Sequence, residues 1–515
     1  MTVVARRSKA LLTVAAAVLA ASLLTAGAAS ARDARVRSFD GTKILVHFFP
    51  AAGLKGSKRA PTVLMGPGWG QLGSTDPNSQ TEPASGVVGI GPLRRNGYNV
   101  VTWDPRGFGG SGGTAEVDSP KYEARDVSAM ISWVARQRRA LLDHRGDPRV
   151  GMVGGSYGGG IQLVSAAIDH RIDAIVPDIA WHSLVTSLGK NHTAKSGWGI
   201  PLYLAAISAK ARLDSHIVDA ATAESSSFQV SAANRSFYAA RGPGDLVKQI
   251  TAPTLLIQGT VDTLFTLHEA VENYSALRAN KVPVKMLWFC GGHGVCLTNP
   301  GDTGRIQRDT LSWLDRYLKR QTTVQTGPGF EWLDQNGRSY SAPSYPPATA
   351  GALAGHGGGT LRLLSTGGSG PAPLPPGLGA AGALGGTFAA AKAGNAVNVA
   401  IAAPKRRSVV LGAPQLRLRY RGQAPTSNAR VLAQIVDEST GKVLGNQITP
   451  IPVNLDGRSH SVSLPLEIVT ATATQGSRFA LQLVAQSTLY DTHPLGGSVT
   501  FSNVKISLPT SRVGR

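Results

Sequence analysis

The chain has 515 residues, enough for two or three domains, and 42% of them are hydrophobic, which provides for a sizeable core. Lysine and arginine (52 residues) outnumber aspartate and glutamate (31), so the formal net charge is +21. The basic residues are scattered and are not interleaved with aromatic residues, which argues against a nucleic-acid-binding protein. The excess charge indicates a solvated basic surface, and the sharper alternative is a loose association with an anionic cell envelope.

The N-terminus has the pattern of a cleaved export signal. Basic residues at positions 6–9 precede the apolar stretch 10–24, and Ala29-Ser30-Ala31 fits the small-residue pattern of a cleavage site. The apolar stretch is short for a membrane span, and no later stretch is long and apolar enough for one. We therefore expect residues 1–31 to be a signal peptide and the mature protein to be secreted.

Residues 32–320 alternate between short apolar runs and segments in which apolar residues recur at helical spacing. This alternation predicts a mostly parallel β-sheet with helices on both faces, the α/β class. The run 61–65 leads into a loop that contains Trp69, and the run 97–103 leads into a loop that contains Asp104 and Arg106. We expect Asp104 and Arg106 to hold their loop in place rather than to take part in chemistry.

A strand, a sharp turn and a helix are predicted around Ser156. The apolar run 149–153 ends in Gly154-Gly155-Ser156-Tyr157-Gly158, and apolar residues then follow at helical spacing from Ile161 to Ile168. G-x-S-x-G at such a turn is the nucleophile elbow, in which glycine removes Cβ clashes and the serine hydroxyl is left exposed. A plain glycine-rich turn is the alternative, so the interpretation depends on partners for the serine.

Two such partners come directly after predicted strands. Asp262 follows the run 254–258, and His293 lies in a glycine-lined loop after the run 284–289. Serine needs a base, histidine is the base near neutral pH, and an aspartate orients the imidazole and stabilises its protonated form. The chain order Ser156, Asp262, His293 is that of the α/β-hydrolase fold. We predict this fold, with these three residues as the catalytic triad.

Two backbone N–H groups are expected to form the oxyanion hole of this site. They would come from Tyr157, at the start of the helix after the serine, and from Trp69, in the loop after an early strand. For Trp69, a role in packing alone is the alternative. The segment from about 182 to 245 interrupts the strand–helix alternation and is predicted to be a helical cap over the site. Its aromatic residues either shape the pocket or form the core of the cap.

The only two cysteines, Cys290 and Cys296, flank His293 as C-x2-H-x2-C. A zinc site formed by these three side chains is the alternative interpretation. In an exported chain a disulfide is more natural, and three of the five intervening residues are glycines that let the backbone bend. We therefore expect a disulfide across the loop, and neither a metal nor a cofactor.

Residues 321–515 have a different composition. The segment 350–400 is rich in Gly, Ala and Pro, which indicates long loops with intervening strands. From residue 415 onward apolar and polar residues alternate, as at 416–420 and 479–483, and turn residues separate the runs. This pattern predicts an antiparallel β-sandwich, in which no catalytic set is evident.

The order of these parts resembles the X-Pro dipeptidyl-peptidase and cocaine-esterase family of α/β hydrolases. The resemblance rests on residues 103–111, on Gly154 to Gly159, on the loops of Asp262 and His293, and on the sandwich entered through 327–332. It implies hydrolysis of a small peptide or an ester through an acyl-enzyme, and a jelly-roll-like third domain. Narrower members use a tyrosine hydroxyl in the oxyanion hole, but the 66–74 loop contains no tyrosine.

The resemblance leaves the substrate open between a dipeptide and a carboxylic ester. A dipeptidyl peptidase has to hold the free amine of its substrate, and Asp214, Asp219 and Glu224 in the cap are the candidate carboxylates. A non-catalytic protein that binds the cell envelope is the alternative from another class. The three triad residues in the correct order argue against it, and the oligomeric state stays open.

Overall fold

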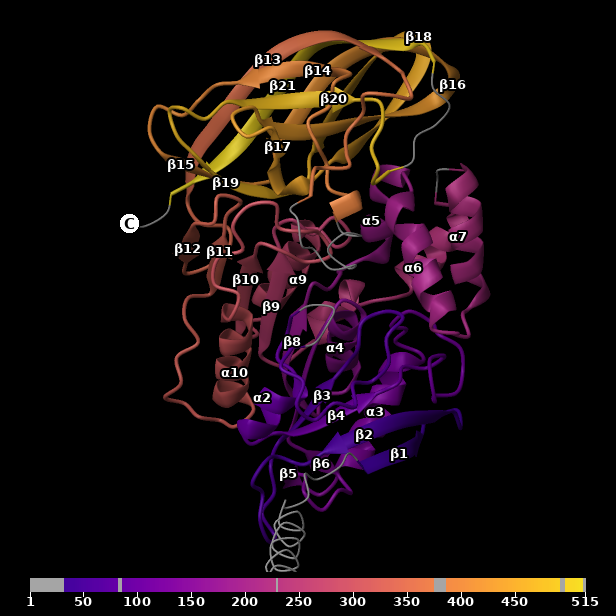
Figure 1. Ribbon diagram of the computed structural model, residues 1–515, viewed down its shortest axis with the longest axis vertical. Helices are drawn as coiled ribbons and strands as arrows, with labels where there is room; N and C mark the ends of the chain where they lie inside the picture. The colour runs from indigo at the N-terminus through magenta and orange to yellow at the C-terminus, as the bar shows by residue number, and fades with distance from the viewer. Residues whose placement is uncertain (1–31, 82–85, 228–229, 375–385, 491–495, 513–515) are drawn as a thin grey trace, which may run out of the picture.

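The computed structural model describes residues 32–512, except 82–85, 228–229, 375–385 and 491–495. The side chains of 222–227 and 426–429 also lie outside this description. The predicted signal peptide, residues 1–31, therefore lies outside the described residues. A unit built on a ten-stranded sheet occupies the lower part of Figure 1, and an antiparallel β domain occupies the upper part.

The ten-stranded sheet has the order β1-β2-β4-β3-β7-β8-β9-β10-β11-β12. Strands β4 to β11 along this order are parallel, whereas β1, β2 and β12 pair in antiparallel fashion. Strands β3, β7 and β9 are buried at every position, which is why they read as continuous apolar runs. The bounds are β1 (Arg32–Arg37), β2 (Lys43–Phe49), β3 (Thr62–Met65), β4 (Asn99–Trp103), β7 (Val150–Gly155), β8 (Ile172–Asp178), β9 (Thr254–Gly259), β10 (Val284–Phe289), β11 (Phe330–Leu333) and β12 (Ser339–Ala342).

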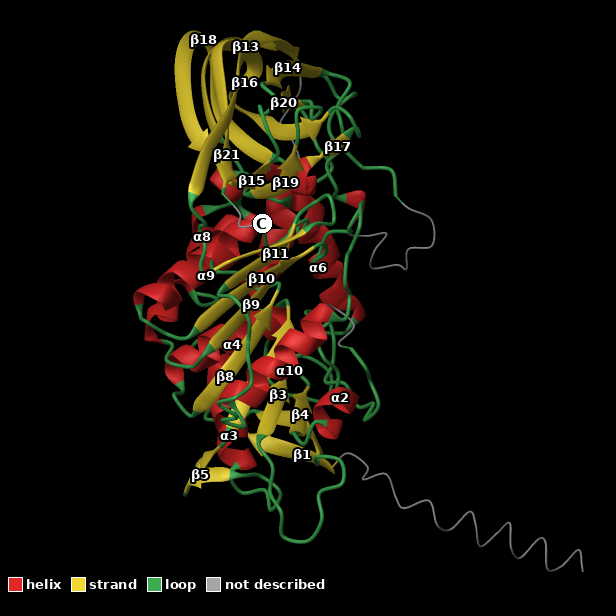
Figure 2. Cartoon of the chain, turned by 90° about the vertical axis from the view of Figure 1, so that its left-hand side faces the viewer, coloured by secondary structure: helices red, strands yellow, loops and turns green. Residues whose placement is uncertain are grey.

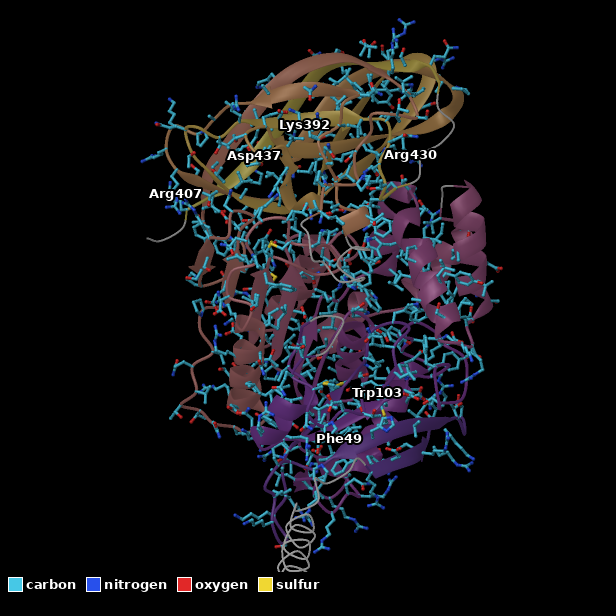
Figure 3. All side chains as sticks on the ribbon, in the orientation of Figure 1. Phe49, Trp103, Lys392, Arg407, Arg430 and Asp437 are labelled. Atoms are coloured by element: carbon cyan, nitrogen blue, oxygen red, sulfur yellow. A yellow bond between two sulfur atoms is a disulfide. The ribbon has the colours of Figure 1, made fainter. Side chains whose placement is uncertain are left out.

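Helices cover both faces of this sheet (Figure 2). Alternate side chains of one strand enter different cores: Met152 packs with α3, α4 and α9, and Val153 packs with α2 and α10. Figure 3 shows Phe49 and Trp103 inside this unit, where both are buried. The arrangement is the predicted α/β-hydrolase fold. The helices are α2 (Ile90–Arg95), α3 (Glu123–Val134), α4 (Tyr157–Ile168), α9 (Leu267–Ala279) and α10 (Arg305–Tyr317). Strands β5 (Leu142–His144) and β6 (Asp147–Pro148) form a separate two-stranded antiparallel sheet.

The sheet continues past the predicted domain boundary at residue 320. Strand β11 pairs with β10 in parallel, with Trp332 opposite Trp288, and β12 then pairs with β11. Phe330 and Trp332 are fully buried, and Phe330 meets Trp288 edge to face with ring centroids 4.8 Å apart. Since these rings complete the core of the sheet, residues 321–342 belong to the hydrolase domain (residues 32–342), and the predicted boundary is too early.

In the C-terminal β domain, called here the sandwich domain (residues 349–511), the named strands pair in antiparallel fashion. Its apolar side chains alternate along the strands and enclose a separate core. The Gly/Ala/Pro-rich segment contributes β13 and β14. The elements are β13 (Thr349–Arg362), β14 (Ala396–Ile401), β15 (Ser408–Gly412), β16 (Gln415–Asp437), β17 (Lys442–Val443), η3 (Leu444–Asn446), β18 (Thr449–Pro465), β19 (Val469–Ala473), β20 (Phe479–Val484) and β21 (Ser498–Ser511).

A helical cap, residues 179–253, is inserted between β8 and β9 and lies on one flank of the molecule (Figure 1). Its core is shared, because cap residues pack with Tyr157, with Phe265 and with Tyr490 of the sandwich domain. Among the described residues, no helix has both the length and the hydropathy that crossing a membrane requires. The cap elements are α5 (Leu184–Leu188), η1 (Lys190–His192), α6 (Ser196–Ser208), α7 (Ser215–Ser227), α8 (Ala232–Ala239) and η2 (Gly244–Gln249).

Candidate active site

Ser156 lies at the sharp turn between β7 and α4. Its backbone has φ 57° and ψ −118°, a strained conformation for a residue with a side chain. A Cβ at Gly158 would overlap the carbonyl oxygen of Gly66, and one at Gly154 would come within 2.6 Å of the same oxygen. The glycines of the elbow therefore allow the loop after β3 to pack directly against the turn that presents the serine.

The structure brings Ser156, His293 and Asp262 together in a hydrogen-bonded chain. His293 Nε2 lies 2.8 Å from Ser156 Oγ, and His293 Nδ1 lies 2.8 Å from Asp262 Oδ2. Asp262 Oδ2 also accepts the backbone N–H of His293 at 3.0 Å. Asp262 Oδ1 accepts the N–H groups of Leu264 and Phe265, both at 2.9 Å. These donors compensate a fully buried carboxylate and fix both the ring and the backbone of the histidine.

The glycines beside His293 let its loop approach the loop of Asp262. Gly292 has φ +104°, and a Cβ there would lie 2.6 Å from Asp262 Oδ2. Cys290 and Cys296 close the loop with a disulfide, and their Cα atoms are 5.3 Å apart. Both sulfurs are thus engaged with each other, so the zinc alternative loses two of its three side-chain ligands.

The two expected oxyanion donors both border the cavity in front of Ser156. Tyr157 is the first residue of α4, so its N–H has no partner within the helix. The indole N–H of Trp69 donates to the carbonyl of Leu202 in α6 at 2.9 Å, and its ring meets Phe108 and Tyr157 edge to face. The backbone N–H of Trp69 makes no hydrogen bond to the described part of the chain. The side chain of Trp69 therefore packs between the nucleophile elbow and the cap, while its backbone N–H stays available for the oxyanion.

The cap holds the loop that follows β9 and carries Asp262. Lys195 is buried, and its ammonium donates to the carbonyls of Thr263 and Leu264, both at 2.9 Å. The indole of Trp198 donates to Thr263 Oγ1 at 3.1 Å. Burial lowers the pKa of Lys195 to about 8. Lys195 carries no signal in the sequence, because an isolated lysine in a helical segment has no distinguishing pattern.

The sandwich domain holds the same region from the other side. The amide of Gln447 donates to the backbone oxygen of Asp262 at 2.7 Å. The amide of Asn446 donates to the backbone oxygen of Val295, in the loop of His293, at 3.0 Å. Both amides are buried. Sequence reasoning missed them as well, since a buried amide at the end of a short turn carries no sequence signature.

Asp104 and Arg106 hold their loop, as expected from the sequence. Asp104 Oδ1 accepts the N–H of Gly73 at 3.0 Å, and Oδ2 accepts the N–H of Gly110 at 2.8 Å. Arg106 forms a buried ion pair with Asp126 at 2.7 Å. Both side chains thus brace the loop that follows β4.

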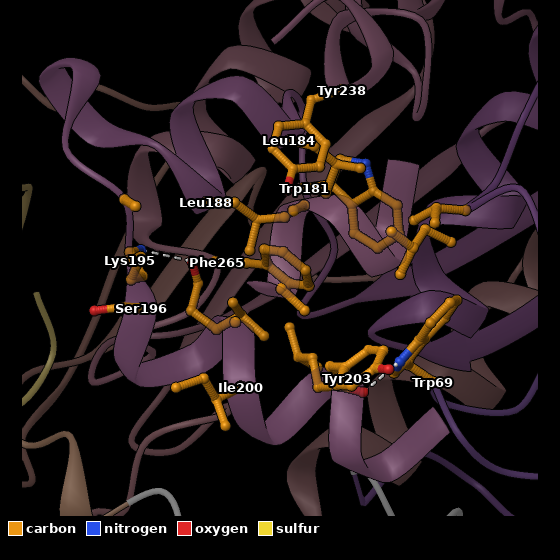
Figure 4. A pocket seen from close by; sticks show the side chains of 18 of the residues that line it. Trp69, Trp181, Leu184, Leu188, Lys195, Ser196, Ile200, Tyr203, Tyr238 and Phe265 are labelled. Carbon is orange, nitrogen blue, oxygen red and sulfur yellow. Dashed lines mark hydrogen bonds between the residues drawn. The ribbon is translucent and has the colours of Figure 1, made fainter. Parts of the chain in front are cut away.

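A cavity of about 930 Å³, counting its open mouth, lies between Ser156 and the cap (Figure 4). Its walls are aromatic and aliphatic side chains, including Trp181, Leu184, Leu188 and Phe265. Lys195 is the one charged side chain among its described lining residues. The sequence left two roles open for the aromatic residues of the cap, and they have both: they line the pocket and they form the core of the cap.

The cap carboxylates proposed for an amine do not line this cavity within the described residues. Asp214 accepts hydrogen bonds from the backbone and the ring of His216, at 2.8 and 2.9 Å. Asp219 is exposed on α7. The side chain of Glu224 lies outside the described residues.

Two buried carboxyl groups lie close to Tyr157, whose hydroxyl is 3.4 Å from Glu123 Oε1. Asp118 is fully buried, neither of its oxygens has a donor among the described residues, and burial raises its pKa well above the usual range. Glu123 accepts the N–H groups of Glu116 and Ser119, and burial raises its pKa to about 7. This pair was not predicted from the sequence, because acidic residues at the start of a helix are ordinarily surface residues.

Comparison with known proteins identifies the family. Residues 40–295 match the model of the X-Pro dipeptidyl-peptidase (S15) family. The hydrolase domain belongs to this family. The resemblance inferred from the sequence is confirmed.

Solved structures extend the likeness to both domains. An α-amino acid ester hydrolase superimposes with a TM-score of 0.69 at 16% identity, covering 95% of this chain and 98% of that one. A CocE/NonD family hydrolase from Staphylococcus aureus gives 0.64 at 13% identity, covering 93% of both chains. An uncharacterised 31.7 kDa protein of Escherichia coli is 34% identical over 85 residues, 16% of this chain. That alignment spans 28% of the curated relative, so it concerns a fraction of the protein.

Proposed function

We propose that this protein is an exported serine hydrolase that cleaves a carboxylic ester or amide through an acyl-enzyme on Ser156. The observation that carries the proposal is the unbroken hydrogen-bonded chain from Ser156 through His293 to Asp262, at the wall of an open cavity. A buried carboxylate that orients an imidazole, which in turn contacts the serine hydroxyl, is the arrangement that makes serine a nucleophile.

In the proposed reaction His293 Nε2 takes the hydroxyl proton as Ser156 Oγ attacks the substrate carbonyl carbon. Asp262 holds the Nδ1–H tautomer and stabilises the imidazolium that forms. The N–H groups of Tyr157 and Trp69 would stabilise the negative oxygen of the tetrahedral intermediate. The leaving group departs with the proton from His293, and a water activated by the same imidazole then releases the acid and restores Ser156. The chemistry requires neither a metal nor a cofactor.

Between peptide and ester, the cavity favours an ester with an uncharged acyl part. A dipeptidyl peptidase has to bury the ammonium group of its substrate, which is unfavourable without a carboxylate partner. Among the described lining residues the one charge is the cation of Lys195, which repels an ammonium group. We therefore rank a carboxylesterase above an X-Pro dipeptidyl peptidase.

Export and surface association are part of the same proposal. The pattern of residues 1–31 is that of a signal peptide, and the Cys290–Cys296 disulfide is compatible with an oxidising compartment. A net charge of +21 favours loose contact with an anionic envelope. A non-catalytic binding protein would have no use for the aligned triad.

Active-site labelling tests the proposal directly. A fluorophosphonate should form an adduct on Ser156, and Ser156→Ala should lose labelling and several orders of magnitude of esterase turnover. Ser165→Ala, which changes a buried serine of α4, is the matched control and should keep both. An adduct on another residue, or normal turnover by Ser156→Ala, would show that the triad is not the reacting group.

A further inference from the structure

Helix α6 of the cap is an apolar helix that stays largely outside the core. It contains no charged residue, and among its large apolar side chains Trp198 alone is buried. Ile200, Leu204 and Ile207 are 43%, 54% and 47% exposed. Spacings of four and three residues place them on one face of the helix. A contiguous exposed apolar face of this kind indicates a surface that contacts an apolar partner.

This face is continuous with the cavity in front of the nucleophile. Ile200 belongs to both, since it is partly exposed and also lines the cavity beside Tyr203 (Figure 4). The hydrogen bond from Trp69 to the Leu202 carbonyl fixes the helix next to the loop that borders Ser156. An apolar path therefore runs from the solvent side of α6 to the proposed site of attack.

The surroundings of α6 suit a lipid surface. Lys210 follows the helix closely and is exposed, and a basic residue at the end of an apolar helix is typical of proteins that lie in a lipid–water interface. Arg212 is exposed as well, but its guanidinium donates to the backbone carbonyls of Gly113 and Ser111. Leu72 is also exposed, and it comes two residues after Gly70, where an added Cβ would lie 3.2 Å from the backbone of Ala205 in α6. A second exposed apolar side chain thus follows the segment that contacts α6.

We propose that the substrate is a carboxylic ester of a long, uncharged acyl chain, taken from a lipid surface on which α6 docks. The proposal rests on the serine hydrolase function proposed above. The acyl chain would pass Ile200 and lie against Leu184, Leu188 and Phe265, with its carbonyl carbon at Ser156 Oγ. Acylation releases the alcohol with the proton carried by His293, and hydrolysis of the acyl-enzyme by one water releases the long-chain acid.

A variant of the exposed face tests the docking step. Leu204→Ser with Ile207→Ser changes two exposed side chains that do not line the cavity. Phosphatidylcholine vesicles that carry a long-chain p-nitrophenyl ester would be the lipid-bound substrate, and p-nitrophenyl butyrate the soluble one. We expect the double variant to lose about tenfold or more in vesicle flotation and in hydrolysis of the vesicle-borne ester, with unchanged butyrate turnover. Ile168→Ser with Leu364→Ser, at exposed apolar positions on α4 and in the sandwich domain, should match the wild type.

Each other outcome overturns the inference. Equal activity of the double variant on vesicles would show that α6 does not dock there. Binding that needs anionic lipid and is insensitive to the substitutions would assign the attraction to charge alone. A dimer that the double variant dissociates would assign the face to a second copy of the chain. Fluorophosphonate labelling separates the two proposals: a labelled enzyme that prefers short or amino-acyl esters refutes the lipid substrate, whereas an unlabelled Ser156 refutes the hydrolase function.

Discussion

The side-chain amide of Gln447 donates a hydrogen bond of 2.7 Å to the backbone oxygen of Asp262, which lies 185 residues earlier in the chain. Its neighbour Asn446 donates to Val295, two residues beyond His293. The sandwich domain therefore contacts both loops that converge on Ser156. This relationship gives the domain a place in the geometry of the triad, in addition to any role in stability.

Removing the Gln447 amide should reduce turnover more than it reduces substrate binding. Gln447→Ala leaves the backbone oxygen of Asp262 without its buried donor, and small displacements of reacting groups lower rates strongly. We expect kcat to fall by about 10- to 100-fold with KM nearly unchanged. Gln482→Ala is the control, because Gln482 is an equally buried amide bonded inside the sandwich domain. If both variants lost the same amount of kcat and a similar amount of Tm, the contribution of Gln447 would be to stability alone.

Loss of the disulfide should affect rate more than stability. The bridge closes a loop with a sequence separation of 6, for which chain entropy predicts only about 2 kcal/mol. The same bridge limits the freedom of a glycine-lined loop that carries His293. We expect Cys290→Ala with Cys296→Ala, or reduction of the wild type, to lower kcat more than tenfold with a small change in Tm. Mass spectrometry that finds two free thiols in the fully active enzyme would contradict this.

The buried carboxyl of Asp118 predicts a pH-dependent difference in stability. Burial raises its pKa well above the usual value of 3.8, so between the pKa of the unfolded chain and that of the folded state the folded protein keeps a proton that the unfolded chain has lost. The stability contributed by this group is present below about pH 4 and is lost as the pH rises toward the pKa of the folded state. Asp118→Asn keeps the shape without the charge, and asparagine tolerates the positive φ of 52° found there.

Thermal unfolding measured against pH checks this prediction. Asp118→Asn should have a higher Tm than the wild type at pH 7, and the difference should shrink toward pH 4. A variant that is less stable than the wild type at pH 7 would mean that the ionised carboxylate is stabilised in the fold.

Filling the cavity should shorten the acyl chain that the enzyme accepts. Ala220 is a small, buried residue that lines the cavity, so Ala220→Phe places a ring in the space assigned to the chain. With p-nitrophenyl esters of increasing length, kcat/KM for decanoate should fall more than about tenfold relative to butyrate. Ala239→Phe, at an exposed position of α8, should leave the chain-length profile unchanged. A parallel loss for both esters in Ala220→Phe would indicate damage to the site instead of a shorter pocket.

The sequence alone was sufficient to predict the hydrolase fold and the residues that the structure brings together at Ser156. The reason is that the determinants are local. A tight strand-to-helix turn requires glycine on both sides of the serine, and Asp262 and His293 each follow an apolar run that can only be a buried strand. The cysteines are two in number and six positions apart, so their pairing is also nearly local.

Tertiary structure decided the domain boundary, the side chains that hydrogen-bond to the loops of the triad, and the apolar lining of the cavity. The sequence pattern placed residues 321–342 in the second domain, but β11 and β12 join the first sheet because Phe330 and Trp332 complete its core. Gln447 and Lys195 act on the Asp262 loop across long sequence separations, and no periodicity records such a contact. The spacing of hydrophobic residues predicts which side chains share a face of a helix or strand. Only the packing of the elements decides whether that face contacts another helix, lines a cavity or, as with Leu204 and Ile207, stays exposed in the described chain.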